Sequence, residues 1–389
     1  MRSMAAERGL RVLMTTDTVG GVWHHALELA AGLAPRGVTV ALASMGPPPD
    51  AVQRAQVAAL SNVSLHESGW RLEWMEEPWS DVRQAGDWLL QLEAELRPDL
   101  IHLNQFSFGS LPFVAPTLVV AHSCVLSWWR AVHGEAAPPA WNAYRQAVGR
   151  GLAGADLVGA PTASMLGTLA DNYGHAEPGV VLPNARDPAT YRPGAKQPVI
   201  LSAGRLWDAA KNLGALEAVA PRLPWPVRVA GATSQPTGGV RRAEGVTSLG
   251  ELRPAELARE FASAAIYALP ARYEPFGQSA LEAGLSGCAL VLGDLPSLRE
   301  VWGDAALYVA PDDHAALQAV LMRLIGDERL RARQAQRARQ RARTYSLRRM
   351  VDGYLDAYDR ILPGAARRSS GTRKTPARPG HLGETVCAS

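Results

Sequence analysis

Short apolar runs alternate with amphipathic helical segments along most of this chain, in two successive series. The first series contains strand candidates at residues 11–17, 38–44, 99–104, 117–123 and 157–162. The second contains strand candidates at residues 198–206, 227–232, 246–250, 265–270, 288–294 and 307–311. Apolar runs of this length are typical of strands buried on both faces, and their alternation with helices indicates parallel sheets covered by helices. The sequence therefore predicts an α/β fold with two doubly wound sheets.

A linker and a polar tail divide the 389 residues. This length exceeds what one hydrophobic core usually holds, so two domains are expected. Residues 180–198 are rich in proline and turn formers and lack helical periodicity. We predict a Rossmann-like N-terminal domain over residues 1–185, a linker over 186–198 and a second Rossmann-like domain over 199–345, with the two domains facing each other across a cleft. Residues 364–389 are expected to be disordered.

The charge balance argues against a nucleic-acid partner. Lysine and arginine total 40 and aspartate and glutamate 37, and the segment from Gly364 onward holds five basic residues against Glu384 alone. The rest of the chain is therefore near neutral, which does not favour wholesale binding of nucleic acid. Nine arginines lie between Arg329 and Arg349 on an expected helix. Two interpretations of this helix stay open: a solvated face, and a surface that contacts an anionic membrane peripherally.

Cysteine usage and hydropathy indicate a cytoplasmic protein. Cys124, Cys288 and Cys387 lie far apart in no CxxC or Cys/His pattern, so neither a disulfide framework nor a zinc site is expected. The N-terminal residues lack a continuous apolar segment, and the most apolar stretch, residues 111–126, is too short for a membrane span and contains His122. We therefore expect neither a signal peptide nor a membrane-spanning helix.

Polar or glycine-rich positions follow several of the expected strands. Doubly wound sheets bind their ligands beyond the carboxyl ends of the strands, where helix N-termini present free N–H groups. Two such sheets in one chain predict a site in the cleft between them. The positions at strand ends are Gly20, Gly21, His122, Arg205, Glu274 and Asp294.

Three motifs give the second series a specific resemblance: GRLWDAAKN at residues 204–212, SLGEL at 248–252 and LPARYEPFGQSALEAGLSG at 269–287. Together they resemble the donor-binding half of the family 4 retaining glycosyltransferases, which have the GT-B fold. The signature of that family is two glutamates separated by seven residues, and Glu274 and Glu282 have this spacing. The motifs TVGGV and AHS extend the resemblance into the first half. Residues 346–363 resemble the helix that crosses back onto the N-terminal domain.

The resemblance implies a hexosyltransferase that retains anomeric configuration and needs no metal or other cofactor. Its donor would be a nucleotide-diphospho-sugar, and its acceptor a glycan, a lipid-linked sugar or a small molecule, as in the synthesis of cell-envelope polysaccharides. No DxD motif lies at a strand end, which agrees with a metal-independent site. Two alternatives stay open: a GT-B nucleotide-sugar 2-epimerase that shares the donor half, and a non-catalytic protein that binds nucleotide sugars.

The donor half supplies most of the implied site. Arg205, which follows Gly204, and Lys211 resemble the cation pair that holds the donor diphosphate, and surface ion pairs are the alternative. Glu282 resembles the residue that accepts hydrogen bonds from the ribose hydroxyls, and its sequence neighbours offer a buried carboxylate no obvious partner. Glu274 resembles the residue that contacts the hydroxyls of the donor sugar.

Backbone groups complete the implied donor site. With Pro275 at the first helical position, three N–H groups would be free to face the sugar or the phosphate, those of Phe276, Gly277 and Gln278. Gln278 stands where members of the family usually carry an aliphatic residue. The remaining residues expected to bind the donor are Ser279, Glu251 and Leu252.

The N-terminal half faces the same cleft in this resemblance. Gly20 and Gly21 resemble the turn that faces the diphosphate and the acceptor, and His122 resembles the histidine that meets the transferred sugar. The residues expected to act in catalysis are therefore His122, Arg205, Lys211 and Glu274, with neither glutamate as a nucleophile. Six tryptophans of this half either stack on acceptor sugars or pack loops over the sheet: Trp70, Trp74, Trp79, Trp88, Trp128 and Trp129.

Overall fold

The N-terminal domain is built on a seven-stranded parallel sheet. The computed structural model describes residues 9–174, 179–234, 239 and 241–362. The first sheet has the strand order β3-β2-β1-β4-β5-β6-β7, and every neighbouring pair is parallel. Its strands are β1 (Arg11–Asp17), β2 (Thr39–Met45), β3 (Val63–Glu67), β4 (Leu100–Leu103), β5 (Thr117–Val120), β6 (Leu157–Ala160) and β7 (Val180–Val181).

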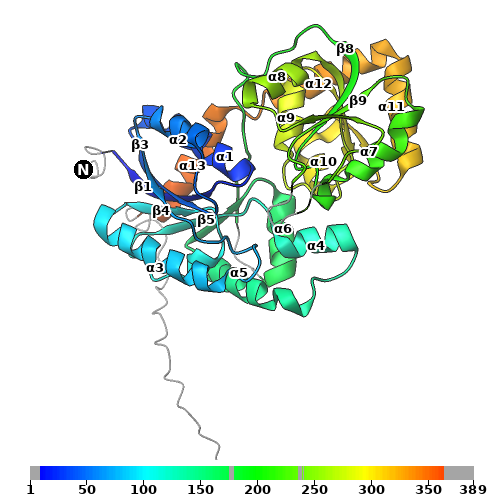
Figure 1. The fold of residues 1–389 in the computed structure, drawn as a ribbon. Helices are drawn as coiled ribbons and strands as arrows, with labels where there is room; N and C mark the ends of the chain where they lie inside the picture. Colours follow the sequence, from blue (N-terminus) through cyan, green and yellow to red (C-terminus); the bar gives the residue numbers. More distant parts are fainter. Residues whose placement is uncertain (1–8, 175–178, 235–238, 240, 363–389) are drawn as a thin grey trace, which may run out of the picture.

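Helices cover both faces of this sheet (Figure 1). Successive residues of β1 point to opposite faces, as expected for a strand buried on both sides. Leu13 packs in one core with helices α3 and α5, and Met14 packs in another with α1 and the C-terminal helix α13. The helices are α1 (Gly21–Leu33), α2 (Ala51–Ala58), α3 (Trp79–Leu96), α4 (Val125–His133), α5 (Asn142–Gly154) and α6 (Ala163–Tyr173).

The C-terminal domain repeats the design with six parallel strands. Its strand order is β10-β9-β8-β11-β12-β13. The strands are β8 (Gln197–Ala203), β9 (Val227–Ala230), β10 (Thr247–Gly250), β11 (Ala264–Leu269), β12 (Ala289–Gly293) and β13 (Leu307–Val309). The helices are α7 (Leu213–Val219), α8 (Pro254–Ser263), α9 (Gln278–Leu285), α10 (Pro296–Trp302), α11 (His314–Gly326) and α12 (Glu328–Ala342).

Each sheet has one switch point, where the strand order runs in opposite directions on its two sides. In the first sheet this point lies between β1 and β4, and in the second between β8 and β11. Open α/β sheets bind ligands in the crevice outside the carboxyl ends of the strands at such a point. The predicted α/β fold with two Rossmann-like domains is therefore confirmed, and each domain has one place where a ligand site is expected.

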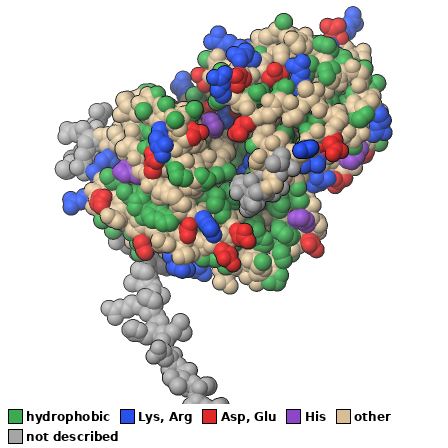
Figure 2. Space-filling model, viewed as in Figure 1, with side chains coloured by type: hydrophobic (Ala, Val, Ile, Leu, Met, Phe, Trp, Pro, Cys, Tyr) green, Lys and Arg blue, Asp and Glu red, His purple; other side chains and the backbone are tan. Residues whose placement is uncertain are grey.

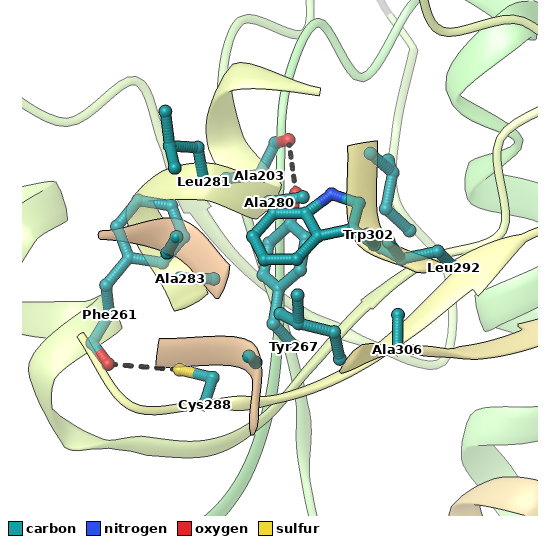
Figure 3. Close-up of a cluster of buried hydrophobic side chains, with 14 of the residues drawn as sticks. Ala203, Phe261, Tyr267, Ala280, Leu281, Ala283, Cys288, Leu292, Trp302 and Ala306 are labelled. Atoms are coloured by element: carbon teal, nitrogen blue, oxygen red, sulfur yellow. Dashed lines mark hydrogen bonds between the residues drawn. The ribbon is translucent and has the colours of Figure 1, made fainter. Parts of the chain in front are cut away.

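Helix α9, which carries Glu282, is anchored in the largest core of the second domain. Figure 3 shows the rings of Trp302 and Tyr267 packed beneath this helix, with the Tyr267 hydroxyl 3.3 Å from the carbonyl oxygen of Ala203. A Cβ atom at Gly284 would lie 2.8 Å from the Trp302 ring, so glycine lets α9 and α10 approach closely. This packing fixes the position of α9 beside the domain boundary.

The end of the described chain returns to the N-terminal domain as helix α13 (Leu347–Ile361), which lies against α1 (Figure 1). Tyr354 and Tyr358 of α13 are fully buried in one core with residues of α1, β1 and β4. A Cβ atom at Gly32 of α1 would lie only 2.5 Å from the Val351 side chain, so the two helices touch at a glycine. The first domain is therefore completed by residues far from it in sequence.

The arginine-rich stretch, residues 329–349, is divided between two helices, although its sequence predicts one. Helix α12 ends at Ala342 and α13 begins at Leu347. One face of α12 is buried against α9 and β12, and Arg341 donates to the carbonyl oxygen of Val301 at 2.6 Å. No helix in the described residues is long and apolar enough to cross a membrane. The expected tail, residues 364–389, lies outside the described residues.

Candidate functional site

The two switch points face each other, and the predicted glycine turn lies where they meet. Gly20 and Gly21 follow β1 of the first sheet. A Cβ atom at Gly20 would lie 3.8 Å from Nη1 of Arg205, and one at Gly21 would lie 3.4 Å from Oε1 of Gln278. Gly20 also has a φ of 94°, in the left-handed region that favours glycine. Charged side chains of both signs gather where the domains meet on the face shown in Figure 2.

Glu274 is held by Lys211 and by its own loop. Nζ of Lys211 donates to Oε2 of Glu274 at 2.6 Å, and Oε1 of Glu274 accepts from the N–H groups of Gly277 at 2.9 Å and Phe276 at 3.4 Å. Burial opposes the ionisation of Glu274, but Lys211 and these N–H groups outweigh it, so the pKa of this carboxyl is lowered. Glu274 is therefore ionised, and Lys211 and the loop hold its carboxylate in place.

This arrangement corrects two expectations about the loop. Helix α9 begins at Gln278, with Gly277 as its N-cap at a φ of 89°, so Pro275 is not the first helical residue. The N–H groups of Phe276 and Gly277 are not free, because the Glu274 carboxylate occupies both. The left-handed conformation of Gly277 turns these two groups back onto the loop.

Arg205 offers a half-exposed cation to the cleft. Its Nη2 donates to Oδ2 of Asp208 at 2.8 Å, and 41% of its side chain remains exposed. Asp208 is buried and also accepts from Nε1 of Trp128, on α4 of the other domain, at 2.9 Å. Burial opposes its ionisation, but Arg205 and Lys211 outweigh this, and the pKa of Asp208 is lowered. One buried aspartate thus orients Arg205 and ties the domains together.

Glu282 has a strong partner that the sequence analysis missed. Arg186, in the linker, donates from Nε to Oε1 of Glu282 at 2.7 Å and from Nη1 to Oε2 of Glu28 on α1 at 2.6 Å. Its Nη2 donates to Oε1 of Gln278 at 2.5 Å. Arg186 is 6% exposed and Glu282 is 7% exposed. The partner of Glu282 is therefore distant in sequence, 96 residues away, and Gln278 faces the same arginine.

Two further carboxyls near the switch points are poised to titrate near neutrality. Burial raises the pKa of Glu28 to about 7, with Arg186 lowering it and Glu282 raising it. Burial also raises the pKa of Asp17, the last residue of β1, to about 7, against the opposing effects of the Val19 N–H group and Arg205. Perturbed carboxyls of this kind are common at functional sites.

His122 is a neutral imidazole with one assigned proton. Nδ2 of Asn104 donates to the carbonyl oxygen of Thr15 at 2.6 Å, which turns Oδ1 toward Nε2 of His122, 2.7 Å away. Because that oxygen can only accept, Nε2 carries the proton and Nδ1 has a free lone pair. Burial lowers the pKa of His122 to about 4, so the ring is uncharged at neutral pH.

Five further residues were predicted to bind the donor, and the structure places them in three kinds of position. Phe276 is 2% exposed and packs against the Tyr345 ring, and Oγ of Ser279 accepts from the Tyr267 hydroxyl at 2.7 Å. These two side chains therefore face the core. Glu251 is exposed and Leu252 half-buried, both after β10, which is the edge strand of its sheet. Gly204 lies beside Lys211, since a Cβ atom there would be 3.6 Å from the lysine side chain.

Several hydrogen bonds join α6 and the residue before it to the second domain. Oε1 and Oε2 of Glu300 accept from the N–H groups of Ala163 and Ser164, at 2.7 and 2.9 Å, at the N-terminus of α6. Oγ1 of Thr162 donates to the carbonyl oxygen of Pro275 at 3.1 Å. Asp294, by contrast, pairs with Arg299 at the surface. Glu300 thus satisfies helix N–H groups of the opposite domain, a role that its own sequence surroundings do not indicate.

A cavity of about 260 Å³ opens between the domains beside Glu274. Its walls come from α4, α6, the loop from Arg272 to Pro275 and the start of α10, and its lining includes Met165, Tyr273 and Asn172. Trp70, Trp74, Trp79 and Trp88 instead pack against the core of the first domain. Among the described residues, no group of three or more His, Cys, Asp or Glu side chains is placed to hold a metal ion.

Comparisons with known proteins agree with this architecture. The profile of "Glycosyltransferase Family 4" matches residues 19–190, and that of "Glycosyl transferases group 1" matches residues 197–327. The O-antigen chain mannosyltransferase B of Escherichia coli is 31% identical over 110 residues, which are 28% of this chain and 29% of that protein. The match therefore spans less than a third of this curated relative.

Solved structures match over nearly the whole chain. Sucrose-phosphate synthase from Thermosynechococcus elongatus gives a TM-score of 0.75 at 17% identity, over 92% of this chain and 100% of that one. Anabaena Alr3699/HepE in complex with UDP-glucose gives 0.69 at 16% identity, over 90% and 99% of the two chains. At these identities the likeness concerns the fold.

Proposed function

The chain belongs to glycosyltransferase family 4, and on that premise we propose that it is a retaining, metal-independent hexosyltransferase. It moves a hexosyl group from a nucleotide-diphospho-sugar to a glycan, a lipid-linked sugar or a small-molecule acceptor. The observation that carries this proposal is the pair of cations, Arg205 and Lys211, fixed by buried carboxylates at the switch point opposite the Gly20 turn.

The cations account for the leaving group. A nucleoside diphosphate gains negative charge as the bond to the sugar breaks, and preorganised cations stabilise that charge without reorganising. Arg205 is oriented by Asp208, and Lys211 is oriented by Glu274. No metal has a place in this scheme, because the two cations carry out the neutralisation.

The neutral His122 supports displacement on one face of the sugar. With Nε2 protonated and engaged by Asn104, the ring offers a lone pair and no positive charge to the sugar. Glu274 is occupied by Lys211 and two N–H groups, so it acts as a hydrogen-bonding partner of the sugar and not as a nucleophile. The departing phosphate then takes the acceptor proton.

The donor is expected to be a UDP-sugar, because the structural neighbour Alr3699/HepE holds UDP-glucose. Glu282, whose Oε1 accepts from Arg186, is the residue that we assign to the ribose hydroxyls. The acceptor enters through the cavity beside Glu274, between α4 and α6.

We propose that the protein acts in the cytoplasm, in peripheral contact with an anionic membrane. The buried free thiols Cys124 and Cys288 suit a reducing compartment. Arg192, Arg339 and Arg343 line one hollow of about 320 Å³ and would meet the lipid headgroups. Sedimentation with phosphatidylglycerol vesicles but not with phosphatidylcholine vesicles would support this contact. Sedimentation that is unchanged when the three arginines are replaced would refute it.

A thermal-shift panel of UDP-, GDP- and ADP-sugars tests the donor site, because a ligand that binds only the folded state raises the melting midpoint. We expect one nucleotide sugar to raise the midpoint of the wild type, and Lys211→Met to abolish the shift. Lys196→Met is the matched control, since Lys196 donates to the carbonyl oxygens of Phe261 and Ser286 and not to Glu274. No shift with any donor would contradict the proposal.

Product analysis separates the proposal from its alternatives. Transfer of labelled sugar with a retained anomeric configuration by NMR, undiminished by EDTA, is the expected result. Isomerised donor without incorporated sugar would indicate a 2-epimerase, and donor binding without turnover would indicate a non-catalytic protein.

A further inference from the structure

Helix α13 places two tyrosine hydroxyls against buried histidines of the first domain. The hydroxyl of Tyr354 lies 3.0 Å from Nε2 of His25 on α1. The hydroxyl of Tyr358, one turn further along α13, lies 2.8 Å from Nδ1 of His102 on β4. All four side chains are at most 1% exposed. The returning helix therefore contributes directed polar contacts as well as apolar packing.

One of these histidines touches the histidine of the candidate site. The ring centroids of His25 and His122 are 4.7 Å apart, with the planes at 61°, an edge-to-face arrangement. Among the described residues, the one hydrogen bond made by the His122 ring is that to Asn104. A ring held through one atom can still tilt about that bond. Contact with His25 supplies the second support.

We propose that His25 and Tyr354 are positioning residues for His122. The Tyr354 hydroxyl holds the His25 ring, the His25 ring sets the tilt of the His122 ring, and that tilt sets the direction of the free Nδ1 lone pair. The catalytic part of this inference rests on the proposed function, in which His122 meets the transferred sugar. Small displacements of a reacting or contacting group lower turnover strongly, so a second support matters.

Tyr354→Phe is the test variant and Tyr358→Phe its matched control. Each removes one buried hydroxyl from the same helix and keeps the ring that packs in the core. Both variants should lower the melting midpoint by a similar amount, because each loses one buried hydrogen bond to a histidine. The hydroxyl of Tyr358 holds His102, whose ring stacks on that of Tyr354, with centroids 5.4 Å apart. In the part of the chain that the structure describes, the ring that makes an edge-to-face contact with His122 is that of His25.

The first readout is independent of any activity. Protein labelled with ¹⁵N in its histidines reports the tautomer and the environment of each ring by NMR, and the His122→Gln spectrum identifies the His122 signals. We expect Tyr354→Phe to shift or broaden the His122 signals and Tyr358→Phe to leave them in place. Unchanged His122 signals in Tyr354→Phe, or equal changes in both variants, would overturn the proposal.

The second readout is turnover of UDP-glucose, followed as release of UDP. We expect Tyr354→Phe to lower kcat by about tenfold with the donor KM within about twofold of the wild type, the pattern of a group that acts after binding. Tyr358→Phe should change both by less than twofold, and equal losses of kcat in the two variants would refute positioning. If the wild type turns over no nucleotide sugar, the proposed function fails, and the NMR result still decides the role of Tyr354.

Discussion

Arg186→Met should show how much one buried cation contributes to the junction between the domains. The guanidinium donates to Glu282, Glu28 and Gln278, which lie on elements of both domains. Methionine keeps a long unbranched side chain and removes the charge. Glu282, which is 7% exposed, then loses its partner in a buried ion pair.

The magnitude follows from the burial of the pair. Removing one partner of a buried ion pair costs about 3–5 kcal/mol, because the other charge is left buried and uncompensated. Arg186 and Glu282 are 6% and 7% exposed, so the variant should lose about 3–5 kcal/mol of unfolding free energy at pH 7.

Urea unfolding followed by tryptophan fluorescence at pH 7 measures this loss. The Arg186→Met/Glu282→Gln variant should recover most of the stability, because a neutral amide needs no counter-charge. A single variant as stable as the wild type, or a double variant no more stable than the single one, would refute the assignment of the pair.

Three further predictions concern the site and the returning helix. Glu274→Gln leaves Lys211 without its counter-charge, so UDP-glucose turnover should fall about a hundredfold, and turnover within tenfold of wild type would contradict the role of this pair. Burial lowers the pKa of His102 to about 3, below the 6.5 of an unperturbed histidine. As pH falls below 6.5, the wild type should lose about 1.4 kcal/mol of unfolding free energy per pH unit relative to His102→Gln, because the unfolded chain binds the proton first. Unfolding free energies from urea that change equally with pH in the two proteins would argue against this. Gly32→Ala places a methyl group against Val351 and should lower the free energy of unfolding in urea by about 1–3 kcal/mol. The Gly32→Ala/Val351→Ala variant should recover this free energy, and a failure to recover it would contradict the contact.

The sequence predicts the two sheets because parallel strands buried on both faces must be apolar throughout. All six residues of β11 are buried, as are all four of β4 and of β5. Strand β3 escaped prediction because it lies at the edge of its sheet and is only half-buried, with polar Ser64, His66 and Glu67 in it. Helix α2 escaped because Val57 is its one buried residue.

The strand-end positions of the site were also predictable, and their partners were not. Arg205 and Glu274 could be found because the carboxyl ends of strands near one switch point converge, whereas Lys211 was found only through the family resemblance. Arg186 lies 96 residues before Glu282, so no local pattern links the two. The hydrogen bonds of Glu274 could not be predicted, because Pro275 suggests that the helix begins there. The left-handed conformation of Gly277 instead delays the start of the helix to Gln278.

Helix α13 also constrains the order in which the protein is made. Between Val181, the end of the first sheet, and Leu347, the start of α13, the ribosome adds about 165 residues, which takes roughly 8–30 s at ~5–20 residues per second. Throughout this interval the first sheet lacks the buried side chains of Met350, Val351 and Tyr354. The nascent N-terminal domain therefore exposes an apolar face that only the last part of the second domain's translation can cover.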